Sequence, residues 1–292
     1  MSSLNFGRLS LFLALCLMPF QVATAQQVPS AWSSGIPVLI PTGGLKINGM
    51  FFQAPGEGPR PTLIYFHGLP GFSGDLDLPL PVSRAGWNVL TLHYRGSWGS
   101  PGEYSYAHQL EDATSAIAFV RDSANARAYS IDTRRVVLTG HSTGGLIAMI
   151  TAANTPGIEG LVLISASDDA AQAVNQYKTP ASRTELAQSK PTPCTGPLSG
   201  CTSQNLDLET LDHASAWSFA ALAPRLAKLP VLMITSDDPY RTENDALEAA
   251  IISHAGPPPA RVHLKTDHAY TSQRAALASA VIDWLRKLSV AR

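Results

Sequence analysis

The stretch V-V-L-T-G-H-S-T-G-G-L at residues 136–146 decides the fold. An apolar run meets the motif G-x-S-x-G there and passes directly into the helix-like stretch 146–150, which predicts a strand, a sharp turn and a helix. Gly140 and Gly144 suit that turn, because a side chain at either position would collide with the neighbouring strand or helix while Ser142 adopts a strained backbone. A Gly/Ser turn without chemistry has the same letters, but the flanking strand and helix favour a nucleophile elbow.

Such an elbow has a direct chemical consequence. It projects the Ser142 hydroxyl from the sheet, and the helix that follows directs unpaired N–H groups and a positive dipole at any anion that forms there.

Length and charge limit the possible functions. The 292 residues suffice for one large core, and no second full domain or internal repeat is visible. The 21 Lys and Arg residues nearly balance the 22 Asp and Glu residues, which gives a formal net charge of -1 without long runs of one sign. A surface for nucleic acid or a polybasic membrane surface is therefore not expected.

The first 25 residues have the features of a signal peptide. A basic residue precedes an apolar run over 9–18, and A-T-A at 23–25 has the small-x-small form that a signal peptidase cleaves. A membrane anchor is the alternative, but the run is short for a bilayer span. Lipidation of Cys16 is also less favoured, because Leu15 precedes it where a small residue is expected. We therefore expect an exported protein, periplasmic or secreted, with a mature domain over residues 26–292 and no stable membrane anchor.

The remaining chain has two cysteines, Cys194 and Cys201, which lie close together in a Pro/Gly-rich segment. A close pair in an exported protein predicts a disulfide that closes a small loop. A metal site would need more ligands than this segment offers. The expected role of the bond is to stiffen a loop.

Short apolar runs alternate with helix-like segments along most of the chain. Strands are expected at residues 38–40, 45–52, 62–66, 87–92, 136–140, 161–165, 231–235 and 261–264. Helices are expected at 80–85, 106–127, 216–228, 242–254 and 273–288, as well as after the elbow. The first two strands would form an antiparallel pair at the sheet edge. The pattern predicts an α/β fold with a mostly parallel sheet flanked by helices.

Residues 168–215 interrupt this alternation. Their periodicity is lost, Pro, Thr, Gln and Ser accumulate, and both cysteines of the later chain lie inside. We expect an irregular insertion that lies over the site as a small cap and shapes the acyl pocket.

A serine hydroxyl needs a base at neutral pH, and His268 is the best candidate. It stands in a loop just after the last predicted strand, and loops at the carboxyl ends of parallel strands are where sites gather. The other histidines lie in less suitable places: within strands or helices, in the insertion, or, for His141, at the variable position of the elbow.

The acid that orients the base is expected after the strand at 231–235. Asp237 and Asp238 are adjacent there, and we favour Asp238, although either residue could instead cap the next helix or turn. Asp168 and Asp169 after the preceding strand are less favoured substitutes.

A tetrahedral oxyanion needs backbone donors that are already in place. The N–H of Thr143, next to the nucleophile, is one candidate. The second is the N–H of Leu69 in H-G-L-P-G at residues 67–71, since Pro70 has no N–H. A tight turn at His67-Gly68 is the plain alternative, and both interpretations can hold together.

Elbow serine, acid and histidine occur in the chain order that resembles the α/β-hydrolase superfamily, over about residues 38–288. Within it, Y-R-G-S-W-G at 94–99 resembles a turn of prolyl-oligopeptidase and acylaminoacyl-peptidase catalytic domains. G-H-S-T-G-G at 140–145 is more similar to esterases and lipases. The full peptidases carry a large propeller domain for which this chain has no room.

The resemblance implies a role for each candidate residue. Ser142 would be the nucleophile, His268 the general base and acid, Asp238 its orienting partner, and Leu69 and Thr143 the oxyanion hole. It implies no metal and no organic cofactor.

We therefore expect an exported serine hydrolase that acts on small or medium carboxylic esters through an acyl-enzyme on Ser142. A peptidase or amidase acting on short acylated peptides is the first alternative, which a carboxylate or arginine placed to grip a peptide terminus would favour. A catalytically silent hydrolase fold used as a binding module is the second alternative.

Overall fold

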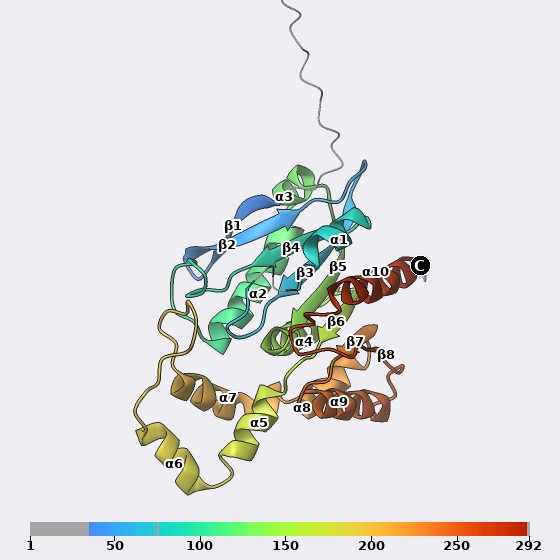
Figure 1. Cartoon of the computed structure of the whole chain (residues 1–292). Coiled ribbons are helices and arrows are strands. Elements are labelled where there is room, and N and C mark those ends of the chain that lie inside the picture. The colour runs from blue at the N-terminus through green and yellow to red at the C-terminus, as the bar shows by residue number, and fades with distance from the viewer. Residues whose placement is uncertain (1–34, 73, 75, 291–292) are drawn as a thin grey trace, which may run out of the picture. The chain divides into compact units, whose positions relative to one another are not determined.

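The computed structural model describes residues 35–72, 74 and 76–290, and its centre is one eight-stranded sheet (Figure 1). The strand order is β1-β2-β4-β3-β5-β6-β7-β8. The strands are β1 (Ile36–Thr42), β2 (Leu45–Phe52), β3 (Arg60–Phe66), β4 (Asn88–Leu92), β5 (Ile131–His141), β6 (Gly160–Ile164), β7 (Val231–Thr235) and β8 (Ala260–His263). Antiparallel pairing is confined to β1-β2 and β2-β4, and every other pair is parallel. The predicted mostly parallel sheet with an antiparallel edge pair is confirmed.

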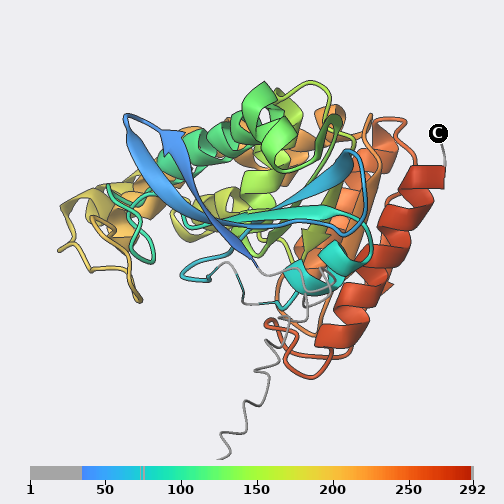
Figure 2. The ribbon, with the colours of Figure 1, turned by 90° about the horizontal axis from the view of Figure 1, so that it is seen from above.

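Helices cover both faces of this sheet. The described helices are α1 (Pro79–Arg84), α2 (Tyr106–Arg121), α3 (Ser123–Ala128), α4 (Thr143–Asn154), α5 (Asp169–Gln176), α6 (Pro180–Gln188), α7 (Ser203–Trp217), α8 (Phe219–Leu226), α9 (Arg241–Ser253) and α10 (Arg274–Val290). Helices α1 and α10 lie on one face of the sheet, whereas α2, α4, α8 and α9 lie on the other (Figure 2). The apolar side chains of the first group belong to one buried core and those of the second group to another.

The central strands explain why the sheet is stable between two helical layers. All five residues of β4, β6 and β7 are buried, and so are the last six of β5. Continuous apolar runs of this kind place side chains alternately into the two cores, which is the pattern of a parallel sheet covered on both faces. The sheet therefore forms a rigid base whose carboxyl edge can position loops.

The prediction of an irregular insertion over 168–215 is wrong, because most of it is helical. It contains α5, α6 and nearly all of α7, and its irregular parts are the short link 177–179 and the stretch 189–202 between α6 and α7. Each helix begins at a side-chain cap: Asp168 accepts from Ala171 N, Thr179 from Ser182 N and Thr202 from Asn205 N. Such caps stabilise short helices whose apolar periodicity is weak. The Thr and Asp residues that form them are also typical of loops, so the composition of the segment resembles that of a loop.

Two predicted helices also differ from the structure at their ends. The helix expected at 106–127 is two helices, because Asp122 has an extended backbone and its carboxylate caps α3. The helix expected at 216–228 is α8, since the extended Ser218 ends α7 and caps the next helix. The predicted signal peptide and its cleavage site lie outside the described residues.

The disulfide between Cys194 and Cys201 is present, with its Cα atoms 5.4 Å apart. The loop that it closes rests on the turn after β4, where Trp98 N donates to Pro197 O at 3.1 Å and Ser97 forms a β-bridge with Leu198. The bond thus fixes part of the insertion against the Y-R-G-S-W-G turn.

Candidate active site

Ser142 sits at the turn between β5 and α4 with φ 55° and ψ -129°. A positive φ is costly for a residue with a side chain, and the surrounding backbone holds it in place. Ser142 N donates to Ile164 O at 3.0 Å, and Ser142 O accepts from Gly145 N at 2.8 Å. This strained geometry is that of the nucleophile elbow expected from the sequence.

The glycines around Ser142 are required by close backbone approach. A Cβ on Gly140 would overlap the peptide group of Gly144, and one on Gly144 would overlap the carbonyl oxygens of Phe66 and His67. The two glycines therefore allow the turn at Ser142 to pack closely against the end of β3 and the start of α4. This close packing is the steric reason why glycines flank the serine.

The three triad candidates follow three strands of the same parallel sheet. Ser142 follows β5, Asp238 follows β7 and His268 follows β8, so all three lie at its carboxyl edge. His268 Nδ1 and Asp238 Oδ2 are 2.9 Å apart, a hydrogen-bonding distance. The structure thus joins Asp238 to His268. Asp237 instead lies 3.1 Å from His263 Nε2.

The Asp238 carboxylate is held in its charged form. Its side chain is 2% exposed, and it also accepts from Ser236 Oγ at 2.6 Å and Tyr240 N at 3.0 Å. Burial raises the pKa of the carboxyl, but the hydrogen bonds from His268 and Ser236 outweigh it and bring this pKa to about 2. A carboxylate bonded to Nδ1 keeps the proton of the neutral imidazole there, so Nε2 carries the lone pair that a base needs.

The His268 ring packs against the elbow. Its centroid lies 4.5 Å from that of His141, the residue before Ser142, and His141 Nε2 lies 2.8 Å from the His268 carbonyl oxygen. The centroid of the Tyr240 ring lies 4.9 Å from that of the His268 ring. These contacts fix the imidazole beside the strand that carries the serine.

The segment after β3 also reaches Ser142. A Cβ on Gly68 would lie 3.0 Å from Ser142 Cβ and 3.6 Å from Ser142 Oγ. Leu69 is the next residue, and Thr143 is the first residue of α4. The two predicted oxyanion donors therefore belong to segments that meet at the serine.

From the sequence, Tyr106 has no assigned role beside this site, and Asp169 is only a less favoured substitute for the acid. Tyr106 Oη donates to Asp169 Oδ2 at 3.0 Å, which connects the first residues of α2 and α5. Burial raises the pKa of the Asp169 carboxyl, and hydrogen bonds from neighbouring hydroxyls, that of Thr143 included, offset this only in part. Asp169 is thus tied to the elbow helix. The signal available in the sequence was the acidic pair directly after β6.

A cavity of about 330 Å³ opens between the Leu69 segment, the start of α2 and the disulfide loop. Its lining includes Leu69, Tyr106, Cys194, Leu206 and Asp207. The insertion therefore forms one wall of a cavity whose other wall is the predicted oxyanion segment.

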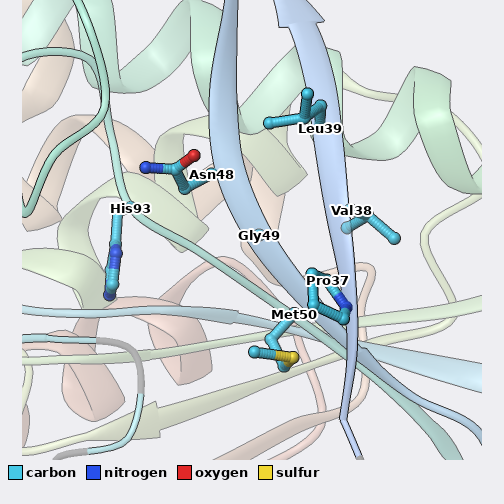
Figure 3. Close-up of a pocket in the computed structure, with 7 residues that line it drawn as sticks. All are labelled: Pro37, Val38, Leu39, Asn48, Gly49, Met50 and His93. Carbon is cyan, nitrogen blue, oxygen red and sulfur yellow. The ribbon is translucent and has the colours of Figure 1, made fainter.

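A second hollow of about 480 Å³ lies over the antiparallel edge, where Figure 3 shows Met50 and His93 near Pro37 and Asn48. None of the triad candidates lines it.

The described residues contain neither a membrane-spanning helix nor a metal-binding cluster. No helix among them has the length and apolar character needed to cross a membrane. No group of three or more His, Cys, Asp or Glu side chains within them is arranged to hold a metal ion.

Comparisons with known proteins agree with this architecture. A family model described as alpha/beta hydrolase fold matches residues 63–272. The uncharacterized protein YfhR of Escherichia coli O157:H7 is 30% identical over 154 residues, which cover 51% of this chain and 52% of that protein. Protein bem46 of Schizosaccharomyces pombe is 30% identical over 120 residues, covering 39% and 38%. The chain therefore spans about half the length, or less, of these curated relatives.

Solved structures resemble it over most of its length. Est1E from Butyrivibrio proteoclasticus superposes with a TM-score of 0.68 at 16% identity, covering 89% of this chain and all of that one. The esterase PF2001 of Pyrococcus furiosus superposes with a TM-score of 0.61 at 17% identity, covering 88% and 92%. At these identities the likeness concerns the fold.

Proposed function

The chain belongs to the α/β-hydrolase fold family, and on that premise we propose that it is a serine hydrolase that cleaves carboxylic esters through an acyl-enzyme on Ser142. One observation carries the proposal above the others. A serine with strained backbone and a hydrogen-bonded Asp238–His268 pair follow strands of one parallel sheet and lie at the same edge. The esterase PF2001, whose solved structure has a similar fold, supports the choice of ester over other bonds.

The first half of the proposed reaction acylates the serine. His268 Nε2 takes the Ser142 hydroxyl proton as the oxygen attacks the ester carbonyl carbon, and Asp238 stabilises the resulting imidazolium. The negative charge that develops on the carbonyl oxygen is stabilised by the N–H groups of Leu69 and Thr143. The imidazolium then donates its proton to the departing alkoxide, so the alcohol leaves and the acyl group stays on Ser142.

The second half of the proposed reaction hydrolyses the acyl-enzyme and regenerates the free enzyme. His268 removes a proton from water, whose oxygen attacks the acyl carbon, and the second tetrahedral intermediate uses the same two N–H groups. Its collapse breaks the bond to Ser142 Oγ, which recovers its proton from the imidazolium. The product is a carboxylic acid, and each bond broken is matched by one formed.

A peptidase or amidase is the second candidate, because one observation favours it. The cavity beside Leu69 contains the Asp207 carboxylate, a group that can hold an amine of a short peptide. We place it second because the same carboxylate suits an amine-bearing ester.

We also propose that the protein is exported. The signal-like first 25 residues and a disulfide, a bond that persists in oxidising compartments, both support this. Sequencing the amino terminus of the mature protein tests it, and we expect the first residue to be Gln26.

The activity is tested with p-nitrophenyl esters of rising acyl length beside aminoacyl p-nitroanilides. We expect turnover of short and medium esters and little turnover of anilides. Ser142→Ala should lower ester turnover at least about 10³-fold. Ser253→Ala, which changes an exposed serine of α9, is the matched control and should leave turnover unchanged. Comparable anilide turnover favours the peptidase, and no Ser142-dependent turnover of either substrate favours the binding module.

A further inference from the structure

Among the described residues that line the cavity of about 330 Å³ beside Leu69, Asp207 is the one charged group. Leu69, Leu206 and Pro193 supply apolar surface, and the described part of the lining also contains Thr and Ser but no Lys, Arg or His. Asp207 is the carboxylate. A ligand that fills this space therefore meets apolar walls, hydroxyl groups and one negative charge.

Within the part of the chain that the structure describes, Asp207 has no cationic partner. Its Oδ2 accepts from the Tyr177 hydroxyl at 2.7 Å, and among the described residues no Lys, Arg or His lies within ion-pair distance of it. Burial, and then the hydrogen bond and charge of Asp207, raise the pKa of Tyr177 to about 12. The phenol is therefore a neutral donor at physiological pH, and no described cationic side chain forms an ion pair with the negative charge at the cavity wall.

A second feature of the wall suits a cation. Tyr106 is among the residues that line the cavity, and aromatic side chains attract ammonium groups. The backbone N–H groups of Tyr106 and Ala107 donate to the Glu209 carboxylate at 2.9 and 2.6 Å, which places another negative group next to Tyr106. An anionic ligand would be repelled by Asp207 here, whereas an ammonium group would meet that carboxylate beside an aromatic residue.

We propose that this cavity binds a protonated amine or quaternary ammonium group of the ester substrate, and that Asp207 is the residue that selects it. The inference rests on the proposed function, because Leu69 joins the cavity to the predicted oxyanion hole. The cationic group would stand on the acyl part or on the alcohol part of the ester, and the same recognition chemistry serves both.

Two isosteric substrate pairs test this. For the acyl part, p-nitrophenyl 6-aminohexanoate is compared with p-nitrophenyl heptanoate. For the alcohol part, butyrylcholine is compared with 3,3-dimethylbutyl butyrate. We expect the cationic member of at least one pair to have a kcat/KM about tenfold or more above its neutral partner. The pair that shows the preference identifies the part of the ester that enters the cavity.

Two variants distinguish a local contact with Asp207 from the general electrostatic field of the protein. Asp207→Asn keeps an oxygen that can accept from Tyr177, and we expect it to reduce the cationic-to-neutral ratio at least about fivefold. Asp212→Asn removes the same charge from an exposed position of the same helix, α7, and should leave the ratio unchanged.

The outcomes distinguish this inference from the proposed function. Ser142-dependent hydrolysis of the neutral esters without a cation preference in either pair overturns the inference and leaves the function standing. An equal loss of preference in Asp207→Asn and Asp212→Asn also overturns it. Absence of Ser142-dependent hydrolysis for all four esters overturns the proposed function, and the inference with it.

Discussion

Replacing Asp238 with Asn tests the hydrogen-bonded pair at the carboxyl edge of the sheet. Hydrogen bonds lower the pKa of this carboxyl from 3.8 to about 2 against the effect of burial. That shift corresponds to about 2.5 kcal/mol in favour of the charged form. A neutral amide loses this interaction with the imidazolium, and its NH₂ group can also turn toward Nδ1 and favour the wrong tautomer. Because of these two effects, we expect kcat/KM to fall about 10³- to 10⁴-fold, which corresponds to a loss of about 4 to 5.5 kcal/mol in transition-state stabilisation.

The chain provides a matched control for this change. Asp237 is the adjacent residue and carries the same charge, but its carboxylate lies next to His263. Initial rates with a short p-nitrophenyl ester should show that Asp237→Asn changes kcat/KM less than about threefold. The reasoning is refuted if Asp238→Asn keeps more than about a tenth of the wild-type kcat/KM, or if the two variants lose equal activity.

Three predictions concern stability. Because the folded-state pKa of Asp238 lies below its ordinary value, its charge stabilises the fold above pH 4 and loses that effect as pH falls from 4 through 2. Urea titrations should show the stability difference between wild type and Asp238→Asn shrinking by about 2 kcal/mol over that range, and a constant difference contradicts this. The fully buried Asp112 carboxylate accepts from Arg95 Nε at 2.7 Å, and Arg95→Met removes this cation. We therefore expect the free energy of unfolding to fall by about 3 to 5 kcal/mol. A loss below about 1 kcal/mol would refute this prediction. Gly140→Ala forces a Cβ into the backbone of the elbow and should lower the free energy of unfolding far more than Gly58→Ala. The Cβ of Gly58→Ala meets open space, and this change should cost about 1 kcal/mol for the left-handed backbone. Equal losses in the two variants would be inconsistent with the steric argument.

The parts of the fold that depend on a strong local pattern were predictable from sequence. The buried strands β6 and β7 are nearly continuous apolar runs. Gly140 and Gly144 specify the elbow around Ser142, because close backbone contact leaves no room for a side chain at either position. The sheet edge follows from the strand alternation, since parallel strands end on the same side.

The insertion was less predictable for a physical reason. Its helices are short and start at polar caps, so their composition is that of a loop, while their few buried side chains, such as Leu186 and Leu206, depend on tertiary contacts. The choice between Asp237 and Asp238 likewise depends on where each carboxylate points, which neighbouring residues in a sequence cannot indicate. The Tyr106–Asp169 contact joins positions 63 residues apart and left no periodic signal.

The nucleophile itself is tested most directly by covalent labelling. The protein is incubated with a fluorophosphonate, digested, and the modified peptide is identified by mass spectrometry. We predict one adduct on Ser142, abolished in Ser142→Ala and greatly slowed in His268→Ala, with activity lost in proportion to labelling. An active, folded protein that takes no label, or that is labelled at another serine with equal loss of activity, would contradict the assignment.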